Sequence, residues 1–162
     1  MEKTKSISLK TPVGILQVEG DAQGLSKVYF PGEKQDNHSS KEIPDELREA
    51  VFQIQSYLKG DLKEFNLQLN PKGSDFQQKV WKALLDIPYG KTISYLQLAK
   101  NIGNEKAVRA VAAANGKNPL SIIIPCHRVI GNDGSLTGYS GGLSRKKWLL
   151  EHENALKQTF LF

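Results

Sequence analysis

Residues 94–116 read SYLQLAKNIGNEKAVRAVAAANG and hold two short helix candidates that a glycine separates. Ser94, with Gln97 three residues later, forms a capping-box pattern at the start of the first candidate. Asn104 is the expected N-terminal cap of the second, which should cover residues 105–115 before the next glycine ends it. Two short helices with such a turn between them fit a helix-turn-helix motif.

The second helix candidate carries very little side-chain bulk. Arg109 is one of only two basic residues in it. A slim helix can approach another surface closely, which suits a tightly packed core as well as a contact with DNA. A cation among so many small residues favours the contact with DNA. The small residues are Ala107, Ala110, Ala112, Ala113 and Ala114.

The next segment, residues 122–131, reads IIIPCHRVIG, and its apolar run predicts a buried strand that is interrupted at Pro125. Residues 131–134, GNDG, are a strong turn signal, and residues 135–139 are a candidate for the return strand. A helix pair followed by a β-hairpin is the winged form of the helix-turn-helix. We therefore expect a winged helix-turn-helix domain in residues 74–162.

Two further helices should belong to this domain. Ser74, with Gln77 three residues on, gives a second capping-box pattern. Ser144 is the expected cap of a last helix, RKKWLLEHENAL. The first turn of that helix holds three cations, where the helix dipole disfavours positive charge, and this placement hints at a phosphate partner. The three cations are Arg145, Lys146 and Lys147.

Residues 1–73 predict a smaller α/β domain, which residues 70–73 link to the rest of the chain. Short strand candidates fill residues 6–30, and residues 31–43 read as a polar loop. A helix is expected from about Pro44 to Gly60, with one apolar stripe. The expected fold class is therefore α/β (α+β): a small sheet-and-helix domain followed by a winged helix-turn-helix domain.

The composition is that of a globular chain and excludes several classes of protein. Apolar residues make up 39% of the 162 residues and charged residues 24%. No apolar run approaches the roughly 20 residues of a membrane span, so we expect no membrane contact. The start of the chain shows no apolar signal-peptide segment. A single cysteine permits no internal disulfide, which suits a reducing compartment such as the cytoplasm.

A zinc site is not expected, because a structural zinc ion usually needs four Cys or His ligands. The chain offers only Cys126, His38, His127 and His152, and His38 lies far away in a polar stretch. No cofactor and no metal are expected.

Positive charge is concentrated in the second half of the chain. Residues 1–73 hold 10 Lys or Arg and 11 Asp or Glu, a balance of −1. Residues 74–162 hold 12 and 6, a balance of +6. This asymmetry suggests a polyanionic partner, although a solvated basic surface would also produce it.

Cys126 is the only thiol of the chain, and His127 follows it directly. A lone cysteine is often a small buried hydrophobic residue. A nucleophilic cysteine needs a base, and neighbours on a regular strand point to opposite faces. Contact with His127 therefore needs a turn or a bridging water, and Pro125 supplies a reason for the strand to break. Glu153 lies nearer the expected inner face of the last helix than Glu151, and so is the better candidate to orient the histidine.

PCHRVI, GYSGGL and LLEHE together resemble the O6-alkylguanine–DNA alkyltransferases, a family also called methylated-DNA–protein-cysteine methyltransferases. The similarity extends through FQQKVWKALLDIPYGKTISY and the RAV segment at Arg109, and covers at least residues 74–153. The start TPVGIL is compatible but less distinctive. Some relatives carry a zinc site in the N-terminal half, and this chain lacks the cysteines for it.

The resemblance implies roles for the residues around the thiol. Cys126 matches the alkyl-accepting cysteine, and His127 the histidine that takes its proton through a water. Glu153 matches the carboxylate that orients this histidine. Asn118, eight residues before the cysteine, matches the asparagine that braces the site.

The resemblance also implies contacts with DNA and base. Tyr95 matches the tyrosine that assists the departing guanine and helps to swing the nucleotide out. Arg109 matches the arginine that fills the vacated place in the base stack, and Ala110 and Arg128 are expected at the same interface. The loop that lines the guanine pocket is matched by Tyr139, Ser140 and Gly141.

The implied function is direct DNA repair by a monomer. An alkyl group passes irreversibly from O6-alkylguanine, or O4-alkylthymine, in double-stranded DNA to the cysteine, so each molecule acts once. Two alternatives make other predictions. A non-catalytic lesion-binding protein would not need its thiol, and a cysteine hydrolase using Cys126, His127 and Glu153 would turn over without DNA.

Overall fold

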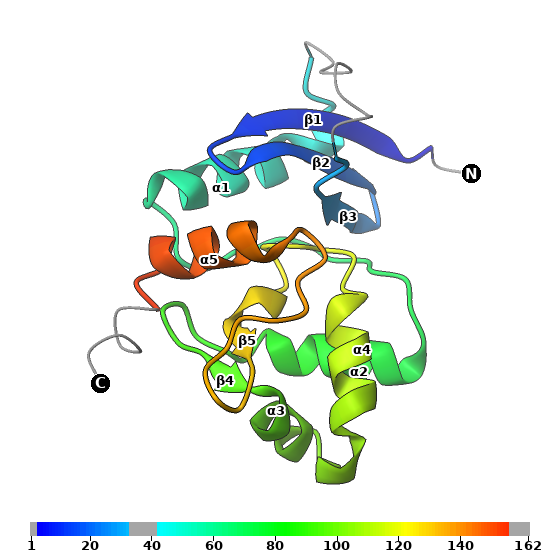
Figure 1. The fold of residues 1–162 in the computed structure, drawn as a ribbon. Coiled ribbons are helices and arrows are strands. Elements are labelled where there is room, and N and C mark those ends of the chain that lie inside the picture. Colours follow the sequence, from blue (N-terminus) through cyan, green and yellow to red (C-terminus); the bar gives the residue numbers. More distant parts are fainter. Residues whose placement is uncertain (1–2, 33–41, 156–162) are drawn as a thin grey trace. The chain divides into compact units, whose positions relative to one another are not determined.

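The computed structural model describes residues 3–32 and 42–155, and the chain splits into two compact units, residues 1–72 and residues 73–162 (Figure 1). Most of the polar loop expected at residues 31–43, with His38, lies outside the described residues. Among the described helices, none combines the length and apolar character that a bilayer crossing requires.

The first unit contains a three-stranded antiparallel sheet in the order β1-β2-β3. Apolar residues alternate with polar ones, so one face of the sheet is buried: Ile7 pairs with Val18, and Leu9 with Leu16. The strands expected within residues 6–30 are confirmed. Their bounds are β1 Lys5–Thr11, β2 Gly14–Asp21 and β3 Gly24–Tyr29.

Among the described residues of this unit, one helix is long. A short 3-10 turn, η2 (Asp45–Leu47), leads into α1 (Arg48–Lys59). Gly60 ends α1 with φ of 88°, and its N–H bonds the carbonyls of Ser56 and Tyr57, which confirms the predicted end of the helix. The buried face of α1 consists of Ala50, Val51, Gln53, Ile54 and Tyr57.

The second unit begins with α2 (Asp75–Leu84), and here the predicted capping box is complete. The Ser74 side chain accepts a bond from the backbone of Gln77, and the Gln77 side chain accepts one from the backbone of Ser74. Trp81 in α2 is 2% exposed, and its Nε1 donates to the carbonyl oxygen of Ala114 at 2.9 Å. This bond ties α2 to the helix that holds Ala114.

The predicted helix pair is present as α3 (Tyr95–Asn101) and α4 (Val108–Gly116), which pack against each other. Ser94 caps α3 as predicted, but the Gln97 side chain bonds Asn101 and leaves that capping box half formed. The predicted cap at Asn104 is wrong. Its side chain makes no capping bond, because a 3-10 turn, η3 (Glu105–Ala107), precedes α4.

The predicted strand and hairpin around the cysteine are also wrong. Residues 121–124 form a turn, η4 (Cys126–Arg128) is a 3-10 turn, and only β5 (Val129–Ile130) pairs, in parallel, with β4 (Ile93–Ser94). Residues 135–139 form no return strand. The turn closes on itself through the bond from Gly131 N–H to the Ser135 carbonyl, and the carbonyl of Thr137 accepts bonds from side chains instead of a neighbouring strand.

The last helix, α5, covers Leu143–His152 and begins earlier than predicted. Gly142, with φ of 96°, occupies the cap position, and Ser144 lies inside the helix without capping it. Trp148 and His152 of α5 are only half-buried, and their rings stack with centroids 4.9 Å apart. The buried residues of α5 are Lys146, Leu149 and Leu150.

Candidate active site

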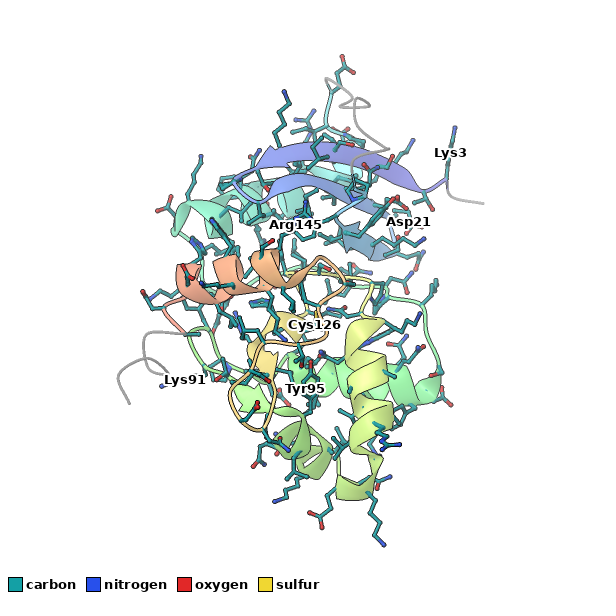
Figure 2. All side chains as sticks on the ribbon, in the orientation of Figure 1. Lys3, Asp21, Lys91, Tyr95, Cys126 and Arg145 are labelled. Atoms are coloured by element: carbon teal, nitrogen blue, oxygen red, sulfur yellow. The ribbon has the colours of Figure 1, made fainter. Side chains whose placement is uncertain are left out.

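Cys126 opens the 3-10 turn η4 and is 4% exposed. Pro125, with φ of −80° and ψ of 62°, turns the chain just before the thiol, and the Cys126 N–H bonds the Ile124 carbonyl at 2.7 Å. The turn replaces the strand that would have sent Cys126 and His127 to opposite faces. Figure 2 labels Cys126 in the second unit, with Tyr95 in the same part of that unit.

His127 and Glu153, far apart in sequence, meet inside the second unit. Nε2 of His127 lies 2.8 Å from Oε2 of Glu153, and both side chains are 0% exposed. Because an ionised carboxylate only accepts, Nε2 carries the hydrogen. The other ring nitrogen, Nδ1, has no hydrogen-bond partner among the described residues and is the basic one. Glu151, the alternative carboxylate, is exposed and lies 3.8 Å from Lys147.

Arg128 points into this cluster, so its expected contact with DNA is wrong. Its Nε donates to Oε1 of Glu153 at 2.8 Å, and its Nη2 to Oε2 at 3.1 Å. Its Nη1 donates to the Ile87 carbonyl at 2.6 Å. The residue is 7% exposed and its charge is matched by a buried carboxylate, so its guanidinium group faces the interior and not a surface phosphate.

The electrostatics of the cluster favour a neutral His127 and a neutral Cys126 beside an ionised Glu153. Burial opposes the charge of Glu153, but hydrogen bonds and charge from His127 and Arg128 hold its pKa far below the ordinary range. Burial lowers the pKa of His127, and this outweighs the opposing effect of Glu153. Burial also raises the pKa of the Cys126 thiol, although Asn118 and Lys146 oppose that shift. The resting site therefore holds a thiol next to a neutral imidazole.

Asn118 braces the turn that presents the cysteine. Its Nδ2 donates to the Ile124 carbonyl at 2.7 Å, and its Oδ1 accepts from the Leu120 N–H at 2.9 Å. Ile122, inside the braced turn, has φ of 75°, which is unusual for a β-branched residue. Such strain persists only where surrounding contacts enforce it, and Asn118 supplies two of those contacts.

Tyr95 faces the loop that follows β5. Its hydroxyl donates to the Thr137 carbonyl at 3.0 Å, and burial raises its pKa. Of the expected pocket loop, Tyr139 is buried and its pKa is raised by burial, whereas Ser140 is exposed and Gly141 half-buried. The loop thus places one aromatic ring inward and leaves its polar neighbour at the surface.

An open cavity of about 320 Å³ lies against Tyr95 and the slim helix α4. Arg109 lines it and is exposed, and Ala110 is exposed on the same helix. Cys126 is not among the lining residues. The other lining residues are Val108, Ala112, Asn132, Thr137 and Gly138.

Lys146 is the functional candidate that sequence reasoning missed. Grouped with Arg145 and Lys147, it was expected to face a phosphate, but it is 0% exposed. Burial lowers its pKa to about 8, against the opposing effect of Cys126. The signal was present in the spacing, because Lys146 shares an i, i+3, i+4 stripe with the buried Leu149 and Leu150.

No group of three or more His, Cys, Asp or Glu side chains in the described part of the chain could hold a metal ion. His38, one of the few candidate ligands, lies outside that part.

Known proteins resemble this chain over most of its length. A family model described as "6-O-methylguanine DNA methyltransferase, DNA binding domain" matches residues 75–155. A methylated-DNA–protein-cysteine methyltransferase of Methanosarcina acetivorans is 47% identical over 153 residues, covering 90% of this chain and 96% of the relative. The enzyme of that name from Mycobacterium tuberculosis is 45% identical over 150 residues, covering 91% of each.

Solved structures show the same likeness over nearly the whole chain. The crystal structure of M. tuberculosis O6-methylguanine methyltransferase has a TM-score of 0.83 at 44% identity and covers 94% of both chains. The structure of M. tuberculosis OGT in complex with DNA also has a TM-score of 0.83, at 45% identity, and covers 93% of this chain and 92% of that one. The chain belongs to the methylated-DNA–protein-cysteine methyltransferase family.

Proposed function

We propose that the protein repairs DNA by moving an alkyl group from O6 of guanine, and also from O4 of thymine, in double-stranded DNA to Sγ of Cys126. One observation carries the proposal: the only cysteine of the chain directly precedes a buried histidine that a carboxylate orients. The family membership of the chain and the names of its relatives support it.

The chemistry balances without a cofactor. Sγ attacks the alkyl carbon as the bond between that carbon and O6 breaks, and the bonding electrons leave with guanine. The thiol proton passes to Nδ1 of His127, the ring nitrogen that Glu153 leaves basic, with a bridging water as carrier. Tyr95 donates a proton to the departing guanine and regains one from the histidine or solvent.

Burial of Cys126 requires the base to leave the helix and enter the protein, as in other enzymes that act on a single base. The cavity beside Tyr95 gives the nucleotide a place of entry, and the loop at residues 137–139 must yield for the base to reach Sγ. Arg109, exposed on α4, has the length to fill the gap in the stack. The alanines around Arg109 on α4 permit the close approach of this helix to DNA that such an insertion needs.

The product is a thioether, which no group in the described site could cleave, so each molecule is used once. All the proposed groups belong to one copy of the chain, in keeping with action as a monomer. A thiol that must stay reduced favours a reducing compartment such as the cytoplasm.

The test is intact-protein and peptide mass spectrometry after mixing with duplex DNA that contains O6-methylguanine. We expect the tryptic peptide that holds Cys126 to gain the mass of one CH2. Cys126→Ser is the matched control and should gain nothing. Absence of the gain in the wild-type protein, or a gain on another residue, would overturn the proposal.

The same assay separates the two alternatives. A lesion-binding protein without transfer would show no mass gain on Cys126, and in a cell its Cys126→Ala variant would clear lesions as well as the wild type. A cysteine hydrolase would release product repeatedly and would show no dependence on DNA. A burst that stops at one methyl group per protein chain contradicts both.

A further inference from the structure

Lys146 presents a buried cation with an unusual pair of partners. Its side chain lies inside the second unit, and its Nζ donates to the carbonyls of Val129 and Thr137, both at 2.6 Å. Nζ also lies 5.9 Å from the centre of the Tyr95 ring. Burying an ammonium group is costly unless an opposite charge and hydrogen bonds compensate it, and hydrogen bonds to two neutral carbonyls return only part of that cost.

One of these carbonyls is shared with the proposed proton donor. The Tyr95 hydroxyl donates to the Thr137 oxygen at 3.0 Å, and Lys146 donates to the same oxygen. A carbonyl oxygen has two lone pairs and can accept both bonds. In the resting protein, the hydroxyl proton that Tyr95 would give to guanine is therefore hydrogen-bonded to the Thr137 carbonyl.

We propose that Lys146 is a positioning residue that keeps the Thr137 carbonyl paired while Tyr95 turns its hydroxyl toward the departing guanine. The inference rests on the proposed function. Thr137 itself is exposed, so water could pair its carbonyl, but without Lys146 the turn of Tyr95 would remove the last side-chain bond that these two residues give to the loop. With Lys146 in place, Tyr95 exchanges one acceptor for another and the loop at residues 137–139 stays anchored to β5.

The charge of Lys146 adds to this effect. As the proton moves from the Tyr95 oxygen to guanine, negative charge develops on the tyrosine. The ammonium group lies near that ring, and the cation stabilises the developing charge. Apart from the effect of its charge on the pKa of the Cys126 thiol, the influence of Lys146 on transfer should pass through Tyr95.

The test is a double-mutant cycle on the single-turnover rate of methyl transfer from duplex DNA. The four proteins are the wild type, Lys146→Met, Tyr95→Phe and the double variant. We expect Lys146→Met to slow transfer about tenfold or more with Tyr95 present, and to add little once Tyr95 is Phe. Independent effects, with the rate losses multiplying in the double variant, would overturn the inference.

Two measurements separate this role from mere support of the fold. Alkylation of Cys126 by iodoacetamide reports the thiol, including the effect of the Lys146 charge on it, without any leaving guanine, so Lys146→Met should slow alkylation less than it slows transfer. An equal loss in both assays would contradict the role. Lys146→Arg keeps a buried cation with several donors and should recover part of the rate.

If Lys146→Met does not fold, the same double-mutant cycle can be measured with Lys146→Gln and Lys146→Arg, each combined with wild-type Tyr95 and with Tyr95→Phe. Gln keeps two N–H donors on one nitrogen but not the charge, so we expect it to be slower than Arg only when Tyr95 is present. Equal rates for the two variants would overturn the inference. Failure of the wild type to transfer at all would instead overturn the proposed function.

Discussion

Arg128 and Glu153 form a two-point ion pair inside the second unit, with Nε 2.8 Å from Oε1 and Nη2 3.1 Å from Oε2. The same carboxylate accepts the Nε2 hydrogen of His127 at 2.8 Å. Because Arg128 balances its charge, Glu153 can stay ionised beside a neutral imidazole. Glu153 thus orients His127 as an ionised carboxylate, and the Nε2 proton stays on the histidine.

Arg128→Met should therefore act on stability and leave the electrostatics of DNA binding unchanged. Removing one partner of a buried ion pair typically costs about 3–5 kcal/mol, because the other charge stays buried and unpaired. Urea denaturation measures this loss, and DNA affinity across a salt series measures phosphate contacts. A stable variant with a shallower salt dependence would mean that Arg128 reaches the DNA after all.

The rate of methyl transfer should hold as the pH falls from 7 toward 6.5. Burial lowers the pKa of His127 below its ordinary value, so the imidazole remains neutral, and able to take a proton, at pH values where an exposed histidine is half charged. The rate should fall only at lower pH, as His127 becomes protonated. Single-turnover rates between pH 5 and pH 8 test this, and a half-maximal rate above pH 6.5 would contradict it.

His127→Asn is the variant that links this pH dependence to the histidine. Loss of a general base typically costs about 10²–10⁴-fold in rate. The variant should lose that much. Its remaining rate should no longer fall over the pH range in which His127 of the wild type becomes protonated. A variant that keeps the wild-type acid limb would assign the titration to another group.

Local signals in the sequence predicted the helices well. The caps at Ser74 and Ser94 and the end of α1 at Gly60 depend on contacts within one turn, and those contacts can be read from neighbouring residues. Ser144 shows the limit of the same rule. A glycine two residues earlier, with φ of 96°, already starts the helix, so the serine has no cap to make.

Distant contacts decided what the sequence could not predict. The return strand is missing because the carbonyl of Thr137 bonds side chains from α3 and α5, which no local pattern reveals. Lys146 was predicted to lie at the surface because the prediction considered its charge and not its place on a buried stripe of α5. The pairing of Glu153 with His127 was predicted through the helix spacing and the family resemblance, whereas the capture of Arg128 by the same carboxylate was not.

Arg109→Ala should weaken repair of duplex DNA more than reaction with the free alkylated base. Arg109 is exposed on α4 beside the cavity, so its loss removes the side chain proposed to fill the stack but leaves the thiol intact. Lys106→Ala is the matched control, because it removes one exposed cation from the turn before α4. We expect a loss of tenfold or more on duplex for Arg109→Ala alone. Equal losses on both substrates would contradict the role.

Gly138→Ala should slow transfer by displacing Tyr95. Gly138 has φ of 69°, and a Cβ built on it would lie 2.9 Å from the Tyr95 hydroxyl oxygen, too close for both atoms to stay in place. Gly142→Ala is the matched control. That glycine also has a positive φ, 96°, but an added Cβ would meet nothing within 4 Å. Both variants should lose about 1–2 kcal/mol of stability from the left-handed backbone, and only Gly138→Ala should also lose transfer rate.

A second substitution isolates the steric part of this prediction. Tyr95→Phe removes the hydroxyl that the new Cβ would strike, so Gly138→Ala should cost less stability in the Tyr95→Phe background than in the wild type. Gly142→Ala should cost the same in both backgrounds, because it does not touch the tyrosine. Urea denaturation of the six proteins measures the coupling. Equal costs of Gly138→Ala in the two backgrounds would show that the loop moves away, and that Tyr95 keeps its place without help from the glycine.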